Sequence, residues 1–128
     1  MQLLILVVDD EPDVEALFRQ HFRRDLRDGR FAMEFAQSAP AALQCISDAG
    51  TASLILILSD INMPGMTGLE LLKKIKSRFS HIQVSMISAY GDRDNYEKAF
   101  KSGAKGFFSK PVDFVSLKKE IADLLTNK

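Results

Sequence analysis

The segment LILILSDINMPGMTG, residues 54–68, joins two unlike pieces of sequence and decides the fold. It opens with five aliphatic residues in a row, which is typical of a strand buried on both faces of a sheet. The run then meets an acidic residue, Asp60, and continues into Asn62, Pro64 and two glycines, which are residue types that form loops. We therefore expect a buried strand that carries a carboxylate to the edge of a sheet, where the chain turns sharply.

Similar apolar runs recur along the chain and alternate with helical patterns. The predicted strands are 3–8, 31–36, 54–58, 82–87 and 106–109. Between and after these runs, apolar residues recur at helical spacing in five segments. The first runs from Pro12 to Leu26, the second begins after Ser38, and the third begins at a Thr67–Glu70 capping box. The fourth spans 94–102, and the fifth begins after Asp113. Five strands alternating with five helices predict a doubly wound α/β domain with a parallel sheet and right-handed crossovers.

The composition limits the class of protein. A chain of 128 residues suits one compact domain. Its 17 basic and 17 acidic side chains give a formal net charge of zero, which argues against a nucleic-acid binder that relies on a broad basic surface. The single cysteine, Cys45, excludes an internal disulfide. No apolar run approaches the ~20 residues of a membrane span, and the opening MQLLILVVDDE lacks the features of a signal peptide, so we interpret it as a strand.

Acidic side chains follow two of the predicted strands. The first strand runs into Asp9, Asp10 and Glu11, and the strand that begins at Leu54 leads to Asp60. Ligands of doubly wound folds bind outside the carboxyl ends of the strands. If these two strands are neighbours, Asp9, Asp10 and Asp60 converge at one mouth. Unit charges ~4 Å apart repel by roughly 4 kcal/mol at an effective dielectric near 20, so the cluster indicates a positively charged partner.

Two further strand ends carry residues that suit the same site. Oxygen ligands with positions left to water are typical of Mg²⁺, often together with a phosphoryl group. Lys110, in GFFSKP, can add a positive charge, and Ser88, in VSMISAYGD, can add a hydroxyl donor. Taken singly, each residue is more commonly a turn former or a solvated side chain. Their joint occurrence at four strand ends predicts a phosphoryl-binding site.

These motifs resemble the receiver domain of two-component response regulators. The resemblance runs from Leu3 to Leu125 and rests on VVDDE (7–11), SDINMPGMTGLELL (59–72), ISAYGD (87–92) and KSGAKGFFSKP (101–111). It implies a single receiver domain over residues 1–128 with a flavodoxin-like, CheY-like (βα)5 fold. In this α/β doubly wound fold the five parallel strands lie in the order 2-1-3-4-5.

The resemblance also implies a chemical role for each motif residue. Asp60 would accept a phosphoryl group by attacking the phosphohistidine of a sensor histidine kinase or a histidine phosphotransfer protein. Lys110 would pair with one phosphoryl oxygen, and Ser88 would donate a hydrogen bond to another. Pro111 would follow a cis peptide bond. Mg²⁺, or Mn²⁺ in its place, would be held by Asp9 (mainly through water), Asp10, Asp60 and the backbone carbonyl of Asn62.

A switch and an output surface follow from the same resemblance. Phe107, the aromatic residue on the fifth strand, would move inward together with Ser88. A downstream effector would bind the face formed by the helix at 94–102, the strand at 106–109 and the last helix. Tyr90 would shield the acyl phosphate from water. We expect a cytoplasmic protein without direct contact to nucleic acid, which catalyses its own phosphorylation and dephosphorylation but turns over no outside substrate.

Three other functions fit parts of the pattern. A degenerate receiver would act only as a protein-binding module, although every position of the phosphoryl site is filled. A phosphatase of the haloacid-dehalogenase type also uses an aspartate after a strand, but it needs a second aspartate two residues later, where this chain has Asn62. A nucleotide or flavin binder presents backbone amides after the first strand, where the acidic residues 9–11 would repel a phosphate.

Overall fold

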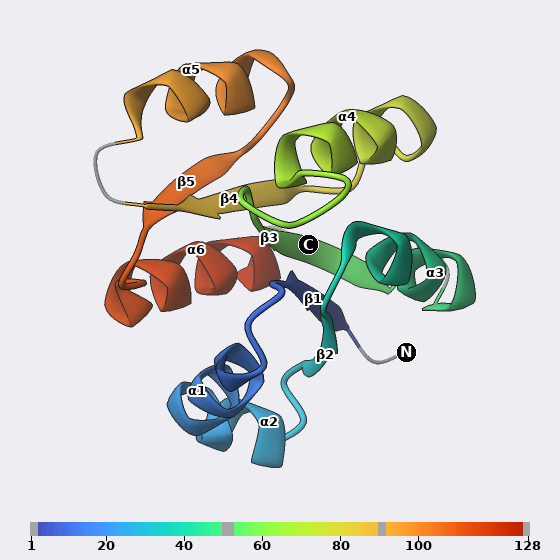
Figure 1. The fold of residues 1–128 in the computed structure, drawn as a ribbon. Helices are drawn as coiled ribbons and strands as arrows, with labels where there is room; N and C mark the ends of the chain where they lie inside the picture. Colours follow the sequence, from blue (N-terminus) through green and yellow to red (C-terminus); the bar gives the residue numbers. More distant parts are fainter. Residues whose placement is uncertain (1–2, 50–52, 90–91, 127–128) are drawn as a thin grey trace.

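Five strands and six helices make up the computed structural model, which describes residues 3–49, 53–89 and 92–126. The strands are β1 (Leu4–Val8), β2 (Ala32–Ala36), β3 (Leu54–Asp60), β4 (Val84–Ser88) and β5 (Gly106–Ser109). The helices are α1 (Asp13–His21), α2 (Arg23–Arg27), α3 (Ala39–Ala49), α4 (Gly68–Arg78), α5 (Arg93–Lys101) and α6 (Phe114–Thr126). The strands form one parallel sheet in the order β2-β1-β3-β4-β5, which confirms the predicted doubly wound fold (Figure 1).

Helices cover both faces of the sheet and create two hydrophobic cores (Figure 1). On one face, α3, α4 and α5 pack against the sheet, and Leu72 and Ala99 share a core with Leu6 of β1. On the other face, α1 and α6 contribute Phe18 and Ile121 to a core that also contains β1 and β3 side chains. Because both faces are covered, β1 and β3 are buried along their whole length, which explains their unbroken aliphatic sequence.

The pairing of β1 with β3 fixes the position of the acidic residues. Val8 of β1 pairs with Ser59 of β3. The residues that come next, Asp9 and Asp60, therefore lie side by side at the carboxyl edge of the sheet. The strand β3 continues through Asp60, two residues beyond the predicted end at Leu58. The extra pairing holds the backbone of Asp60 within the sheet, which makes it a more rigid position than a loop residue.

The first helical pattern is not one helix. Apolar spacing from Val14 to Leu26 predicts a continuous helix, but the structure has two, separated at Phe22, whose φ of −106° and ψ of 17° are not helical. The Phe22 ring centroid lies 6.0 Å from that of Phe31 and 6.0 Å from that of Phe114. Packing against these distant aromatic residues overrides the local helical pattern. The prediction of five helices is therefore wrong by one.

Side chains cap the N-termini of α4, α6 and α5. Thr67 and Glu70 form the predicted capping box, in which each side chain accepts a hydrogen bond from the backbone N–H of the other. Asp113 accepts hydrogen bonds from backbone N–H groups of the first turn of α6, also as predicted. The N-cap of α5 is Asp92, a residue just before the predicted helical pattern of 94–102. This cap matters because its carboxylate lies close to the end of β4, where the Ser88 hydroxyl donates to it.

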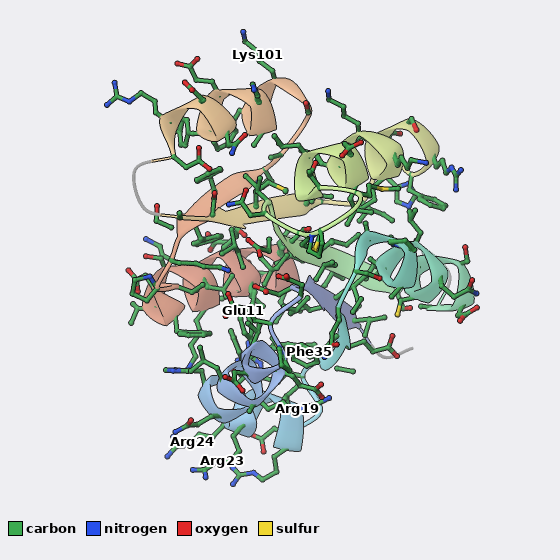
Figure 2. The ribbon with its side chains drawn as sticks, viewed as in Figure 1. Glu11, Arg19, Arg23, Arg24, Phe35 and Lys101 are labelled. Atoms are coloured by element: carbon green, nitrogen blue, oxygen red, sulfur yellow. The ribbon has the colours of Figure 1, made fainter. Side chains whose placement is uncertain are left out.

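Some of the basic side chains point outward from two separate ends of the molecule (Figure 2). Figure 2 shows Arg23 and Arg24 of α2 pointing outward at one end and Lys101 of α5 pointing outward at the other. The guanidinium of Arg19 lies 5.0 Å from the centroid of the Phe35 ring and covers it. None of the helices within the described ranges is both long enough and apolar enough to cross a lipid bilayer.

Candidate functional site

Three carboxylates meet at the carboxyl edge of β1 and β3. Asp9 and Asp10 follow β1, and Asp60 is the last residue of β3. One carboxylate oxygen of each residue lies within 4.8 Å of those of the other two. Asp9 and Asp60 are only 5% and 3% exposed, so two of the three charges are largely removed from water. The structure thus brings together the acidic side chains that the sequence places at two different strand ends.

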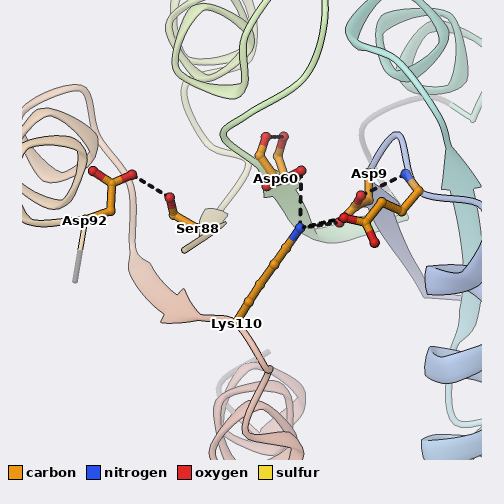
Figure 3. A network of polar contacts seen from close by, with 7 residues as sticks. Asp9, Asp60, Ser88, Asp92 and Lys110 are labelled. Atoms are coloured by element: carbon orange, nitrogen blue, oxygen red, sulfur yellow. Dashed lines mark hydrogen bonds and ion pairs between the residues drawn. The ribbon is translucent and has the colours of Figure 1, made fainter. Parts of the chain in front are cut away.

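Lys110 supplies a positive charge between the two buried carboxylates (Figure 3). Its Nζ lies 3.4 Å from Asp9 Oδ2, 3.4 Å from Asp60 Oδ2 and 3.7 Å from Glu11 Oε1. Its backbone N–H donates to the carbonyl oxygen of Ser88 at 2.8 Å, which keeps the end of β5 beside the end of β4. The peptide bond that links Lys110 to the following proline is cis, as the resemblance implied.

Burial and mutual repulsion set the protonation of the cluster. Burial raises the pKa of Asp60, and the Asp9 charge raises it further, while Lys110 and the N–H of Asn62 lower it by less. Burial also raises the pKa of Asp9, against the Glu11 N–H and Lys110. Burial by itself would lower the pKa of Lys110, but the Asp60 and Asp9 charges and the hydrogen bond to Asp60 together outweigh it and raise this pKa. The site therefore holds more negative charge than one lysine stabilises, and it favours a further cation.

The turn after Asp60 depends on glycine at two positions. Gly65 has a φ of +77°, in the left-handed region that favours glycine. A Cβ added at Gly68 would fall on the carbonyl oxygen of Asp60, so α4 begins in direct contact with the backbone of the preceding strand. The Gly68 N–H donates to the carbonyl oxygen of Ile61 at 2.9 Å, which closes the turn. Asn62 is exposed within this turn, and the ligand role of its carbonyl stays a prediction.

Ser88 is buried at the end of β4, but its hydroxyl faces away from the carboxylates. Its Oγ donates to Asp92 Oδ2 at 2.6 Å. Figure 3 shows Asp92 on one side of Ser88 and Asp60 on the other. The Ser88 hydroxyl, with help from Asn95, lowers the pKa of Asp92. Sequence reasoning assigns no role to Asp92, because the direction of a serine hydroxyl leaves no signal in the sequence.

This fold and this set of side chains match a known family over nearly the whole chain. Residues 5–122 match the family model described as the response regulator receiver domain. The chain belongs to this family. It is therefore a CheY-like receiver domain of two-component systems, a class of domain that signals and does not turn over an outside substrate.

Known receiver proteins resemble the chain over different shares of their length. The chemotaxis protein CheY of Pseudomonas aeruginosa is 32% identical, with 91% of each chain covered. Three further curated relatives are 32% to 34% identical, but the chain spans only 22% to 48% of their length. A receiver domain protein from Clostridium thermocellum gives a TM-score of 0.85 at 26% identity, with 98% of this chain and 95% of that chain covered. The receiver domain of Saccharomyces cerevisiae Ssk1, crystallised with the histidine phosphotransfer protein Ypd1, shares the fold, with a TM-score of 0.79 at 21% identity over 96% of this chain and 88% of that chain.

In this receiver domain, the predicted switch residue Phe107 borders a groove. Phe107 is half-buried on β5, and its ring centroid lies 5.3 Å from that of Tyr96 of α5 in an edge contact. Both rings line a groove of ≈ 570 Å³, and Asp92 lies in the same wall. The predicted switch residue Phe107 and Asp92, which accepts the hydrogen bond from the Ser88 hydroxyl, therefore line the same groove. Tyr90, with its predicted shielding role, lies outside the described residues.

A second groove of the receiver domain, of ≈ 590 Å³, opens beside the acidic cluster. Asp9 and Lys110 form part of its polar end. Its other walls are mainly apolar side chains from α1 and from the start of α6, and they include Leu17 and Val115. These two side chains are exposed although they are apolar. An apolar surface therefore continues directly into the carboxylate site, and we call it the α1–α6 groove.

Proposed function

We propose that this receiver domain accepts a phosphoryl group on Asp60 from a phosphohistidine and changes conformation as a result. A carboxylate oxygen of Asp60 would attack the phosphorus, the N–P bond of the donor would break, and its electron pair would stay on the imidazole nitrogen. The observation that carries the proposal is the setting of Asp60. It is a buried carboxylate at a strand end, with the Lys110 ammonium 3.4 Å away and two more carboxylates beside it.

The donor atoms present fit Mg²⁺. The side-chain ligands are all carboxylate oxygens, the hard donors that Mg²⁺ and Mn²⁺ prefer, and they lie within 4.8 Å of one another. We therefore propose that the ion is held by Asp9 (mainly through water), Asp10, Asp60 and the backbone carbonyl of Asn62. When bound, Mg²⁺ would offset the repulsion between the carboxylates and the incoming phosphoryl oxygens.

Lys110 and Ser88 would bind the phosphoryl oxygens. The Lys110 ammonium already lies beside the Asp60 carboxylate, so it can exchange this ion pair for one with a phosphoryl oxygen bound to Asp60. Ser88 would have to turn its hydroxyl from Asp92 toward Asp60. That rotation, with the inward movement of Phe107, is the proposed switch, in which a local change of charge biases a two-state element. Hydrolysis of the acyl phosphate at the same site would reset it.

The phosphoryl donor would be a sensor histidine kinase or a histidine phosphotransfer protein that packs into the α1–α6 groove. Because this groove continues into the acidic site at Lys110, a helix lying there would bring its phosphohistidine to Asp60. The Ssk1 receiver domain, which shares the fold, was crystallised with a protein of this kind. A downstream effector would bind the face formed by α5, β5 and α6, which includes Tyr96 and Phe107.

The proposed extent and setting of the domain rest on simpler observations. Residues 1–128 would form one receiver domain, since the family match spans residues 5–122 and both cores draw on side chains from β1 and β3. The free Cys45 suits a reducing compartment, so we propose a cytoplasmic location. The net charge of zero supports signalling through proteins without direct contact to nucleic acid.

Incubation with acetyl phosphate and Mg²⁺ tests the proposal. We expect intact-mass spectrometry to find one added phosphoryl group, which is lost in Asp60→Asn and when the metal is removed with EDTA. Asp123→Asn, at an exposed position of α6, is the matched control and should keep the adduct. A wild-type protein without an adduct would favour the degenerate receiver that only binds partners. Turnover of generic phosphomonoesters would favour the phosphatase.

A further inference from the structure

The Ser88 hydroxyl is already engaged in a hydrogen bond. Ser88 is fully buried, and its Oγ donates to Asp92 Oδ2 at 2.6 Å, a short distance that is typical of a charged acceptor. A serine hydroxyl has one proton to donate. A phosphoryl oxygen on Asp60 would need the same proton. Two anionic acceptors, Asp92 and the phosphoryl group, would therefore compete for one donor.

We propose that Asp92 is a positioning residue that holds the Ser88 hydroxyl away from Asp60 and thereby weakens phosphoryl binding. The inference rests on the proposed function and adds a residue that acts through Ser88. The Ser88–Asp92 hydrogen bond forms only in the unphosphorylated arrangement, so it raises the population of that arrangement. The affinity for the phosphoryl group falls by the same factor. Removing the Asp92 acceptor should therefore make the receiver easier to switch on.

Asp92 also connects Ser88 to the helix that borders the switch residue. As the N-cap of α5, it accepts hydrogen bonds from the backbone N–H of Asn95 at 3.4 Å and from Asn95 Nδ2 at 2.7 Å. Its carbonyl oxygen accepts from the Tyr96 N–H at 3.1 Å, and the Tyr96 ring contacts Phe107. Loss of the hydrogen bond from Ser88 to Asp92 would therefore change the contacts of the first turn of α5 and of the Tyr96–Phe107 pair next to it. Asp92 lies at the junction between the phosphoryl site and the proposed output face.

A helix cap alone would not require this arrangement. An N-cap needs an oxygen that accepts from the backbone N–H groups of the first turn, and serine or asparagine supplies one as well as aspartate does. Asp92→Ser keeps a capping oxygen on a shorter side chain, which withdraws the acceptor from Ser88. Asp92→Asn keeps the shape of the side chain but offers a neutral, weaker acceptor. The two variants therefore separate the capping role from the competition for the Ser88 proton.

The test is a calorimetric titration of the full chain with beryllofluoride, an anion that mimics a phosphoryl group, at fixed Mg²⁺. We expect Asp92→Ser to bind about tenfold more tightly than the wild-type protein, which is the order expected for one hydrogen bond to a charged acceptor. Asp92→Asn should fall between the two and carries the test if Asp92→Ser does not fold. In a Ser88→Ala background, both Asp92 substitutions should leave the beryllofluoride affinity unchanged, because the hydroxyl for which Asp92 and the phosphoryl group compete is absent.

Asp113→Asn is the matched control. Asp113 caps α6 and accepts hydrogen bonds from the Ser116 backbone N–H at 3.3 Å and the Ser116 hydroxyl at 2.9 Å, so it is a capping aspartate that has no contact with Ser88. Its substitution should not change beryllofluoride affinity. Equal effects of the Asp92 variants in both Ser88 backgrounds, or no tighter binding, would overturn the inference and leave the proposed function intact. Failure of the wild-type protein to bind beryllofluoride would overturn both.

Discussion

At the scale of single residues, the site holds charge that its surroundings only partly compensate. Asp9 and Asp60 are buried next to each other and share Lys110 as their cation. One ammonium group does not neutralise two carboxylates, and burial, the largest cause, raises the pKa of both acids. The arrangement therefore costs stability in the metal-free protein, and the same uncompensated charge gives the site its affinity for a cation.

Replacing Asp60 with asparagine should stabilise the metal-free protein. The substitution removes one of two neighbouring buried charges and keeps a similar side-chain volume, so we expect the free energy of unfolding to rise by about 1 kcal/mol at neutral pH. Urea denaturation in the presence of EDTA measures the difference. Asp123→Asn, at an exposed position of α6, should leave the midpoint unchanged. A drop in stability in Asp60→Asn would show that Lys110 compensates the charge more fully than the geometry indicates.

The pH dependence of this gain has a defined sign. A carboxyl group whose pKa is raised by folding binds its proton more tightly in the folded state. Its cost is therefore absent below its ordinary pKa of 3.8 and grows as the pH rises through the folded-state pKa. The stability gained in Asp60→Asn should vanish at acidic pH and be complete near neutrality. Urea midpoints of both proteins, compared from about pH 3 to about pH 7, follow this trend, and a gap that is constant with pH would contradict it.

Single residues also show what sequence can and cannot predict about the site. Asp9, Asp60 and Lys110 could be assigned to one edge because strand ends are visible in the hydrophobic pattern and parallel strands end together. The direction of the Ser88 hydroxyl could not be assigned, since it depends on one rotamer. The position of Asp92 depends in turn on where the next helix begins, and helix starts are hard to place from sequence to within two residues.

At the scale of elements, the start of α4 is packed against the backbone of β3. A side chain at Gly68 would meet the carbonyl oxygen of Asp60, and a carbonyl in a paired strand has no room to move. Gly68→Ala should therefore destabilise the fold by about 3 kcal/mol, as overpacking against backbone does. It should also reduce phosphoryl uptake from acetyl phosphate, because relief of the clash displaces Asp60. Urea denaturation and intact-mass spectrometry measure the two effects.

Gly29→Ala is the control that separates a clash from backbone strain. Gly29 has a φ of +71°, but open space surrounds the position of its Cβ. Alanine there should cost only about 1 kcal/mol, the penalty for a left-handed residue with a side chain. Phosphoryl uptake should stay at the wild-type level. If Gly68→Ala cost no more than Gly29→Ala, the contact between α4 and β3 would be looser than the structure shows.

Elements were predictable where one local signal was sufficient. The capping box of Thr67 and Glu70 is such a signal, because both hydrogen bonds form within three residues of the chain. The break between α1 and α2 was not predictable. It depends on the Phe22 ring packing against Phe31 and Phe114, and neither contact is visible in a helical period. Local pattern therefore determined the type of each element, and distant packing determined where this one was divided.

At the scale of the whole molecule, the two proposed partner surfaces share α6 and otherwise lie over opposite faces of the sheet. The α1–α6 groove lies on the face that α1 and α6 cover, whereas Phe107 packs with the core on the opposite face. The acidic site lies between these faces, at the carboxyl ends of β1 and β3. A donor and an effector would therefore both contact α6, while their other contacts would lie on different sides of the domain. Phosphoryl chemistry at the carboxyl edge would connect the two surfaces.

A charge placed in the α1–α6 groove should slow phosphotransfer from a protein donor but not the chemistry at Asp60. Leu17 is 44% exposed, so Leu17→Glu should change the free energy of unfolding by no more than about 0.5 kcal/mol. In the complex, its carboxylate would be buried against apolar side chains of the donor, and transfer from a phosphorylated histidine kinase should slow at least about tenfold. Phosphorylation by acetyl phosphate, which needs no docking surface, should keep the wild-type rate.

The matched control for the groove is Ala41→Glu, which adds the same charge at an exposed position of α3, on the other face of the sheet. It should leave transfer from the kinase and labelling by acetyl phosphate unchanged. The kinase for the assay is the one that, among a panel of purified histidine kinases, phosphorylates the wild-type protein fastest. Unchanged transfer in Leu17→Glu would remove the groove from the donor's contact surface. A parallel loss of acetyl phosphate labelling would show instead that the substitution disturbs the acceptor site, because that small donor reaches Asp60 without touching α1.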